Sequence, residues 1–176
     1  MVAVALGSAA AASTIPIDMQ TLEKEQLYRL LEFEDEDVLC RFTDMFAVGE
    51  EEARDILQET LKFLYISQVP GTFIPDDLLI IDEMWHNMIL FTPQYHAFSQ
   101  QHFKKYFHHI PAGKKEKEER KRVLDENPEK ARAAYLEKLE NLVSIIYDHL
   151  GEDTVVKWFR EYPVKYSKDR IKALRK

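Results

Sequence analysis

Apolar residues recur every three to four positions along most of the chain, which is the spacing of one face of an α-helix. This pattern predicts helices over residues 19–33, 35–46, about 76–90, 128–150 and about 153–162. It also predicts one helix that begins at residues 50–52, one that begins at residue 93 and ends before residue 111, and a last basic helix over residues 165–176. No stretch shows a strand pattern of comparable strength. The sequence therefore predicts an all-α protein, a single compact helical bundle of six to eight helices.

The length and composition agree with one domain. A chain of 176 residues suits a single core, and 45 % hydrophobic with 31 % charged residues is typical of a globular protein. Only 5 glycines and 7 prolines argue against a β-architecture built on many tight turns. We expect residues 18–176 to form the helical domain. Residues 1–17 read as a disordered leader or an expression remnant, since they lack the basic start of a signal peptide.

Charge and cysteine content exclude several classes of function. The net charge is -7, and residues 1–60 alone hold four basic and fourteen acidic side chains, which argues against nucleic acid as a partner. No run approaches the roughly 20 apolar residues of a membrane span. Cys40 is the one cysteine, so a disulfide framework is excluded and a reducing cytoplasm is expected. The mixed charge run at 114–122 is expected to be an exposed helix or loop.

Five of the six histidines fall within residues 81–111, and this concentration is the candidate chemistry of the chain. On a helical wheel of residues 76–90, apolar side chains cover most of the circumference, and only Glu83 and Asn87 mark a solvent-facing side. Asp82 and His86, one turn apart, are therefore expected to be largely buried. A buried carboxylate and imidazole each need a partner.

The next predicted helix supplies such a partner. If this helix stays regular to its end, Tyr95 and His109 share one face, and antiparallel packing brings His109 toward Asp82 and His86. One carboxylate and two imidazoles are a ligand set of non-haem iron and of zinc. The sequence thus predicts one divalent transition metal, iron or zinc, on Asp82, His86 and His109, with Tyr95 as a hydrogen-bonding residue behind them. His108 and His102 are the reserve ligands.

Two functions remain open at this point. One is a metal-dependent oxidase or hydrolase of unknown substrate, since an open coordination position would activate water or dioxygen. The other is a helical interaction or adaptor module, in which Asp82 and His86 form a structural hydrogen-bonded pair and the acidic stretches 32–37 and 50–52 face a protein partner. Phosphate-binding glycine loops and nucleophile elbows are absent from the sequence, and the E-x-x-H of di-iron bundles occurs only once, at Glu83–His86.

The same region carries a family resemblance. Asp82-x-x-Trp85-His86, then Leu90-Phe91-Thr92, Tyr95, Phe98 and Phe107-His108-His109-x-Pro111, resembles the core motif of small, mostly uncharacterised bacterial proteins. A related pattern is similar to the glycine-rich-domain-containing-protein-like family of plants and fungi, whose glycine-rich segments are absent here. The resemblance implies that Asp82, Trp85, His86, Tyr95 and His109 form one constellation, and it implies no reaction. Lys104 stands where the family pattern has glycine.

Overall fold

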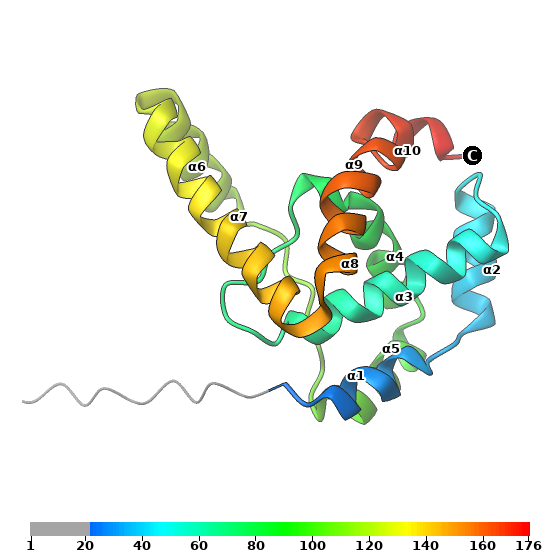
Figure 1. The fold of residues 1–176 in the computed structure, drawn as a ribbon. Coiled ribbons are helices and arrows are strands. Elements are labelled where there is room, and N and C mark those ends of the chain that lie inside the picture. The colour runs from blue at the N-terminus through cyan, green and yellow to red at the C-terminus, as the bar shows by residue number, and fades with distance from the viewer. Residues whose placement is uncertain (1–21) are drawn as a thin grey trace, which may run out of the picture.

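The computed structural model describes residues 22–176, and helices make up the architecture of this part (Figure 1). The helices are α1 (Lys24–Leu31), α2 (Glu36–Met45), α3 (Glu50–Ile66), α4 (Leu79–Leu90), α5 (Thr92–Phe103), α6 (Lys114–Glu126), α7 (Pro128–Leu150), α8 (Glu152–Val156), α9 (Tyr162–Lys165) and α10 (Lys168–Leu174). A 3₁₀ turn, Asp76–Leu78, leads into α4, and a π-helical segment, Lys157–Glu161, joins α8 to α9. An isolated antiparallel bridge pairs Phe46 with Arg175.

The all-α prediction is confirmed for the described residues. Because α8, the π-helical segment and α9 follow without a break, residues 22–176 hold nine separate helices, against the expected six to eight. The additional helix is α6, which the mixed charge run forms in full, whereas the basic tail forms its expected helix as the short α10. The predicted leader, 1–17, and the start of the first predicted helix lie outside the described residues. Within 22–176, no helix has both the length and the apolarity that a membrane crossing demands.

Helix α3 lies at the centre of the core. Ten of its side chains are buried, and α1, α2, α4 and α7 all pack against it (Figure 1). It opens on Glu50, Glu51 and Glu52, where the helix dipole favours negative charge. The preceding helix, α2, is capped by Asp35, whose carboxylate accepts hydrogen bonds from the main-chain N–H groups of residues 37 and 38. These local signals explain why both helices begin where the sequence predicts.

A row of acidic residues along α3 binds the C-terminal helices. Glu59 is buried, and its carboxylate accepts hydrogen bonds from Trp158 Nε1 at 2.7 Å and from Lys157 Nζ at 3.0 Å. One turn earlier, Asp55 accepts a second bond from Lys157, and Glu52 accepts one from the Tyr166 hydroxyl at 2.6 Å. A buried carboxylate is tolerated only where charge and hydrogen bonds compensate its lost hydration. The residues of the π-helical segment supply both for Glu59.

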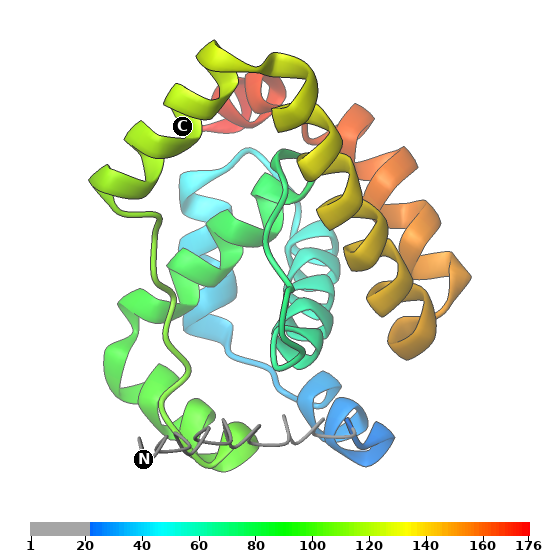
Figure 2. The same ribbon diagram turned by 90° about the vertical axis from the view of Figure 1, so that its left-hand side faces the viewer.

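The pair α4–α5 positions the histidine-rich stretch. The two helices meet at Phe91, and the chain then returns through residues 104–113 in a largely extended conformation (Figure 2). The expectation that α5 continues to His109 is therefore wrong, because the helix ends at Phe103. Lys104 adopts a left-handed conformation with φ of 59°, and its N–H donates to Gln100 O at 3.2 Å. This is the usual way to terminate a helix, although glycine normally occupies such a position.

Replacing Lys104 by glycine should stabilise the fold. The left-handed conformation costs an ordinary residue about 1–2 kcal/mol, and glycine adopts it freely, although glycine also loses more chain entropy on folding. We therefore expect Lys104→Gly to raise the free energy of unfolding by about 0.5–1 kcal/mol, measured by urea denaturation. The matched control is Gln101→Gly, at an exposed position inside α5, which should lower it by about 1 kcal/mol. A lower free energy of unfolding for Lys104→Gly than for the unchanged protein would contradict the argument that Lys104 is strained.

Candidate metal centre

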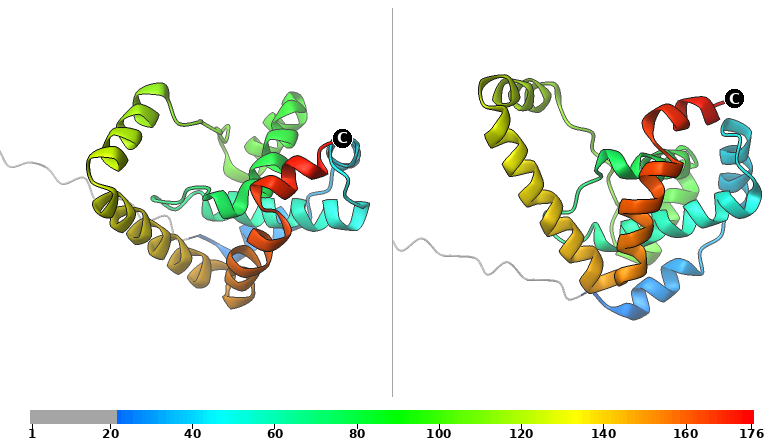
Figure 3. Two further views of the ribbon diagram at one scale, coloured as in Figure 1. Left: turned by 90° about the horizontal axis from the view of Figure 1, so that it is seen from above. Right: turned by 45° about the horizontal axis from the view of Figure 1, so that its top comes forward.

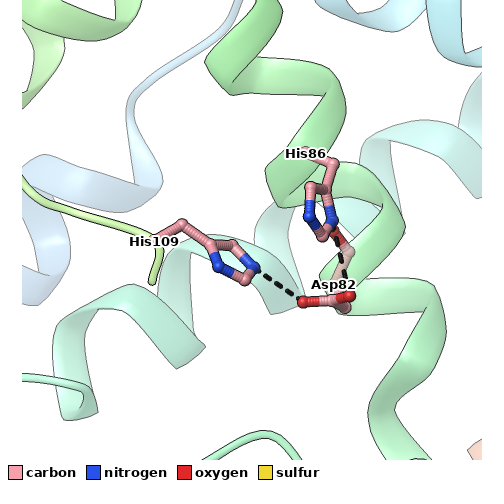
Figure 4. Close-up of side chains that lie close together, drawn as sticks. All are labelled: Asp82, His86 and His109. Carbon is pink, nitrogen blue, oxygen red and sulfur yellow. Dashed lines mark hydrogen bonds and ion pairs between the residues drawn. The ribbon is translucent and has the colours of Figure 1, made fainter. Parts of the chain in front are cut away.

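Three side chains from two segments converge beside the start of α4. Asp82 and His86 lie one turn apart on α4, and the extended segment after α5 places His109 opposite them (Figure 4). His109 Nε2 is 2.8 Å from Asp82 Oδ1, and His86 Nδ1 is 3.4 Å from Asp82 Oδ2 and 2.8 Å from the Asp82 main-chain oxygen. One potential ligand atom from each residue lies within 4.8 Å of the others. Asp82 is thus the link between the two imidazoles.

The cluster is more exposed than the helical wheel predicts. The side chain of His86 is 55 % exposed, so the expectation that it is largely buried is wrong. The side chains of Asp82 and His109 are 25 % and 14 % exposed and thus mostly covered. The next residue of α4, Asn87, is buried, although it was expected to face solvent. The solvent-facing side of α4 is rotated toward His86, and one edge of the cluster is open to water.

Helix α2 explains this rotation. It packs against α4, and the Asn87 side chain donates to the main-chain oxygen of Val38 at 2.7 Å and accepts from Arg41 at 2.5 Å. A buried amide whose donor and acceptor are both paired carries little penalty. The inward orientation of Asn87 therefore leaves His86 on the uncovered side of the helix.

A chain of two hydrogen bonds holds the segment that carries His109. The buried Tyr95 hydroxyl accepts from Trp85 Nε1 at 2.8 Å and donates to the main-chain oxygen of Phe107 at 2.6 Å. Burial raises the pKa of Tyr95 to about 12, so the hydroxyl keeps the proton that it donates at neutral pH. Tyr95 thus acts on His109 through the main chain two residues away.

Aromatic packing fixes the imidazole of His109 itself. Its ring centroid lies 4.2 Å from that of Trp85 and 4.4 Å from that of His86. The Trp85 ring also packs against Phe107, at 5.9 Å between centroids. His109 is therefore held by ring contacts with both neighbours, while its Nε2 points at the Asp82 carboxylate (Figure 4).

The other histidines of the region lie outside this cluster. His102, a reserve ligand, packs on Phe98 at 4.9 Å, and burial, assisted by the positive charges of Arg29 and Lys104, lowers its pKa. His108, the second reserve, packs against Tyr106 at 4.8 Å. His96 is exposed. Among residues 22–176, the carboxylate and histidine atoms that gather closely enough for one ion come from Asp82, His86 and His109.

The spacing of the three residues suits one transition-metal ion. Ligands at 2.0–2.2 Å from an ion are separated from one another by roughly 2.9–3.5 Å in tetrahedral or octahedral geometry. The 2.8 Å between His109 Nε2 and Asp82 Oδ1 is close to this range, the 3.4 Å contact of His86 Nδ1 is to the other carboxylate oxygen, and one ligand atom from each residue lies within 4.8 Å of the others. The donor set of one carboxylate oxygen and two imidazole nitrogens matches zinc and non-haem iron.

Sequence reasoning named these three residues but missed how His109 reaches the other two. It assumed a continuous helix, whereas the connection is an extended segment held at the Phe107 carbonyl, a main-chain group that no side-chain motif reveals. One local signal was available. Lys104 and Lys105 are consecutive cations, which are favoured in the last turn of a helix and just beyond it.

The chain belongs to the UCP032817-like family, whose model matches residues 28–125. The match runs from α1 into α6 and includes Asp82, Trp85, His86, Tyr95 and His109. The helices that follow α6 lie outside it. No curated protein and no solved structure matches the chain.

Removal of the Tyr95 hydroxyl should loosen the segment that carries His109. Tyr95→Phe leaves the buried Trp85 N–H and the Phe107 carbonyl without their shared partner. We expect a loss of about 1–3 kcal/mol in the free energy of unfolding, measured by urea denaturation, and faster amide exchange in residues 104–110. Tyr28→Phe, at a side chain that is 61 % exposed, is the control and should change neither quantity. Equal stability of the two variants would contradict this role of Tyr95.

Proposed function

We propose that this protein is a metalloprotein in which Asp82, His86 and His109 bind one divalent transition metal, with iron and zinc as the ions that suit the donors. The observation that carries the proposal is the convergence of three ligand atoms, from a helix and a separate extended segment, within 4.8 Å. Neutral imidazoles and a carboxylate together favour a transition metal over calcium or magnesium, which prefer oxygen ligands.

Three protein ligands would leave coordination positions free, as catalytic sites require. The half-exposed His86 lies at the edge where water or a substrate would approach. A metal held in this way supplies Lewis acidity for hydrolysis or, as iron, a site for dioxygen chemistry. We therefore propose a metal-dependent hydrolase or oxidase. In this proposal Asp82, His86 and His109 are the ligands, and Trp85 and Tyr95 hold His109 in place.

The competing function is a purely structural network, in which Asp82 accepts hydrogen bonds from His86 and His109 without any metal. The 2.8 Å contact between His109 and Asp82 is compatible with it. The exposure of His86 favours the metal site, because it leaves this imidazole accessible to an ion from solvent. The adaptor alternative has less support, since part of its proposed surface is used within the fold: Glu36 bonds to Arg54, and Glu52 to Tyr166.

Two finer expectations belong to the same proposal. The pattern of Asp82, Trp85 and His86 supports a relationship to the glycine-rich-domain-containing-protein-like family. The single cysteine, Cys40, is an exposed thiol, which supports a reducing compartment such as the cytoplasm.

Loss of either imidazole should strongly weaken metal binding. We expect the protein, purified without a histidine tag, to bind about one equivalent of zinc or iron by elemental analysis. In zinc titrations, His86→Ala and His109→Ala should each weaken binding by about 100-fold or more, since even residues behind the ligands contribute 10–100-fold. His96→Ala, an exposed histidine of the same region, is the control and should bind as the unchanged protein does. Equal retention of metal by all three variants would show that the cluster is a hydrogen-bonded network.

Metal binding should also raise thermal stability. An ion that binds only the folded state adds about 2.7 kcal/mol at a free concentration of 100 times Kd. We expect the Tm of the unchanged protein to rise with added zinc after chelation and dialysis, whereas that of Asp82→Asn should rise much less. A Tm that does not respond to zinc or ferrous iron would contradict the proposed site, whatever reaction the protein catalyses.

A further inference from the structure

A polar hollow lies where α1, the end of α3 and the end of α5 meet, and none of the residues that line it belongs to the metal centre. Helices α1 and α3 lie side by side at this edge of the molecule (Figure 3, right). The hollow has a volume of about 310 Å³, which is at the lower end of the range for small-molecule sites. We call it the α1–α5 hollow. Its polar lining consists of Glu23, Gln26, Arg29, Gln68, His102 and Lys104.

Hydrogen bonds of two side-chain amides frame the hollow. Gln26 on α1 donates to the side-chain oxygen of Gln68 at 3.3 Å and to the main-chain oxygen of His102 at 2.9 Å. Gln68, just after α3, donates in turn to the main-chain oxygen of Tyr65 at 2.9 Å. These bonds tie α1 to the ends of α3 and α5. The three elements that carry the lining side chains are therefore fixed relative to one another before a ligand binds, which lowers the cost of binding.

Positive charge dominates the hollow, although the chain as a whole carries a net charge of -7. Arg29 and Lys104 are cations at neutral pH, and the exposed Glu23 is the one carboxylate that lines the hollow beside them. Among the ion pairs of residues 22–176, none involves Arg29 or Lys104. Two cations that have no acidic partner in the described chain attract an anion.

The imidazole of His102 faces the same hollow, and its ring nitrogens have no hydrogen-bond partner within the described part of the chain. The ring packs on Phe98 at 4.9 Å between centroids and is partly buried. Burial, assisted by the charges of Arg29 and Lys104, lowers the pKa of His102, so the imidazole is neutral at pH 7. A bound anion would offset the two cations. His102 would then take up a proton more readily and gain a second N–H donor.

The backbone of Lys104 gives a second, independent indication of a ligand. Its φ of 59° is a conformation that glycine adopts freely and that lysine adopts only with strain. The ammonium group compensates little of this strain within the fold, since its bond, 3.0 Å to the main-chain oxygen of Gln101, lies at an exposed position. Strained residues of this kind are concentrated at functional sites. A ligand for the ammonium group explains why a lysine stands at this position.

We propose that the α1–α5 hollow binds a phosphate group, free or on a small molecule, through Arg29, His102 and Lys104. A phosphate monoester carries nearly two negative charges and three acceptor oxygens, which match the two cations and the three donor groups. A carboxylate has one charge and two oxygens. The planar guanidinium of Arg29 can donate two parallel hydrogen bonds to such an anion, and the ammonium group of Lys104 acts as a point charge.

Titration of the full chain with inorganic phosphate and with glycerol 3-phosphate tests the proposal, followed by the NMR signals of the histidine side chains. We expect a saturable shift of the His102 signals with a Kd of roughly 1 mM or tighter, while those of the exposed His96 stay unchanged. Tighter binding of the ester assigns the ligand to phosphorylated small molecules. Tighter binding of the inorganic ion assigns it to free phosphate, and both results support the site.

Sulfate tests the part of His102, because its charge stays the same between about pH 6 and pH 8, whereas that of phosphate changes. A bound dianion raises the pKa of His102 and is bound more tightly by the protonated imidazole. Sulfate should therefore bind at least about threefold more tightly at pH 6 than at pH 8. Equal affinity at both pH values would contradict the proposal that His102 is one of the donors.

Matched substitutions separate the hollow from the general charge of the protein. Lys104→Gln and Lys105→Gln each remove one charge from neighbouring exposed lysines, and of the two Lys104 lines the hollow. Arg29→Gln and Lys104→Gln should each weaken phosphate binding by about tenfold or more, and Lys105→Gln by less than about threefold. Lys104→Gly removes the charge and the strain together. It should lose phosphate binding while its free energy of unfolding rises, so that unfolding is excluded as the cause.

Three results would overturn the proposal. The His102 signals could show no saturable shift up to about 10 mM phosphate, or Lys104→Gln and Lys105→Gln could weaken binding equally. Loss of phosphate binding in Asp82→Asn would place the anion at the metal centre instead. Zinc binding, measured in buffer without phosphate, should be the same in Lys104→Gln and in the unchanged protein, so the phosphate site and the metal site fail independently.

Discussion

The hydroxyl of Tyr95 joins the three segments from which the candidate metal centre is built. It belongs to α5, accepts its hydrogen bond from Trp85 on α4, and donates to the carbonyl of Phe107 in the extended segment. An extended chain has no helical ladder to define its position, so its placement depends on contacts of this kind. Because the hydroxyl is buried, neither bond competes with water. The position of His109, two residues after Phe107, follows from this junction and from the packing of its ring on Trp85.

The sequence was sufficient to predict the helices and the three residues of the cluster, but not how exposed these residues are. Helical periodicity and capping residues such as Asp35 are local, and the predicted starts of α2, α3 and α7 agree with the structure to within a residue. The exposure of His86 depends on which helix covers which side of α4. That was decided by α2, whose Arg41 and Val38 pair with Asn87 and turn it inward. A helical wheel contains no information about such distant partners, and apolar residues around most of α4 made its solvent-facing side hard to place.

Helix α3 connects the matched part of the chain to the helices beyond it. Phe63, buried on α3, lies 6.3 Å from the ring of Trp85 and 6.1 Å from that of Trp158. Trp85 supports His109, and Trp158 donates to the buried Glu59. The family match ends at residue 125. Trp158, which lies beyond it, nevertheless contacts Phe63, and Phe63 also contacts Trp85 beside the candidate site. The C-terminal helices therefore bind to α3, the helix that also packs against α4.

The energetics of the cluster bear on whether it is merely structural. Ion pairs and hydrogen bonds at partly exposed positions contribute only about 0–1 kcal/mol, and His86 is more than half exposed. The segment that carries His109 is already held by Tyr95 and by Trp85, which are buried and need no help from Asp82. The contact between Asp82 and the exposed His86 therefore adds little to the stability of the fold. The convergence of the carboxylate and the two imidazoles at an open edge is what the proposed metal site requires, and a single metal ion is the ligand that their oxygen and nitrogen atoms would suit.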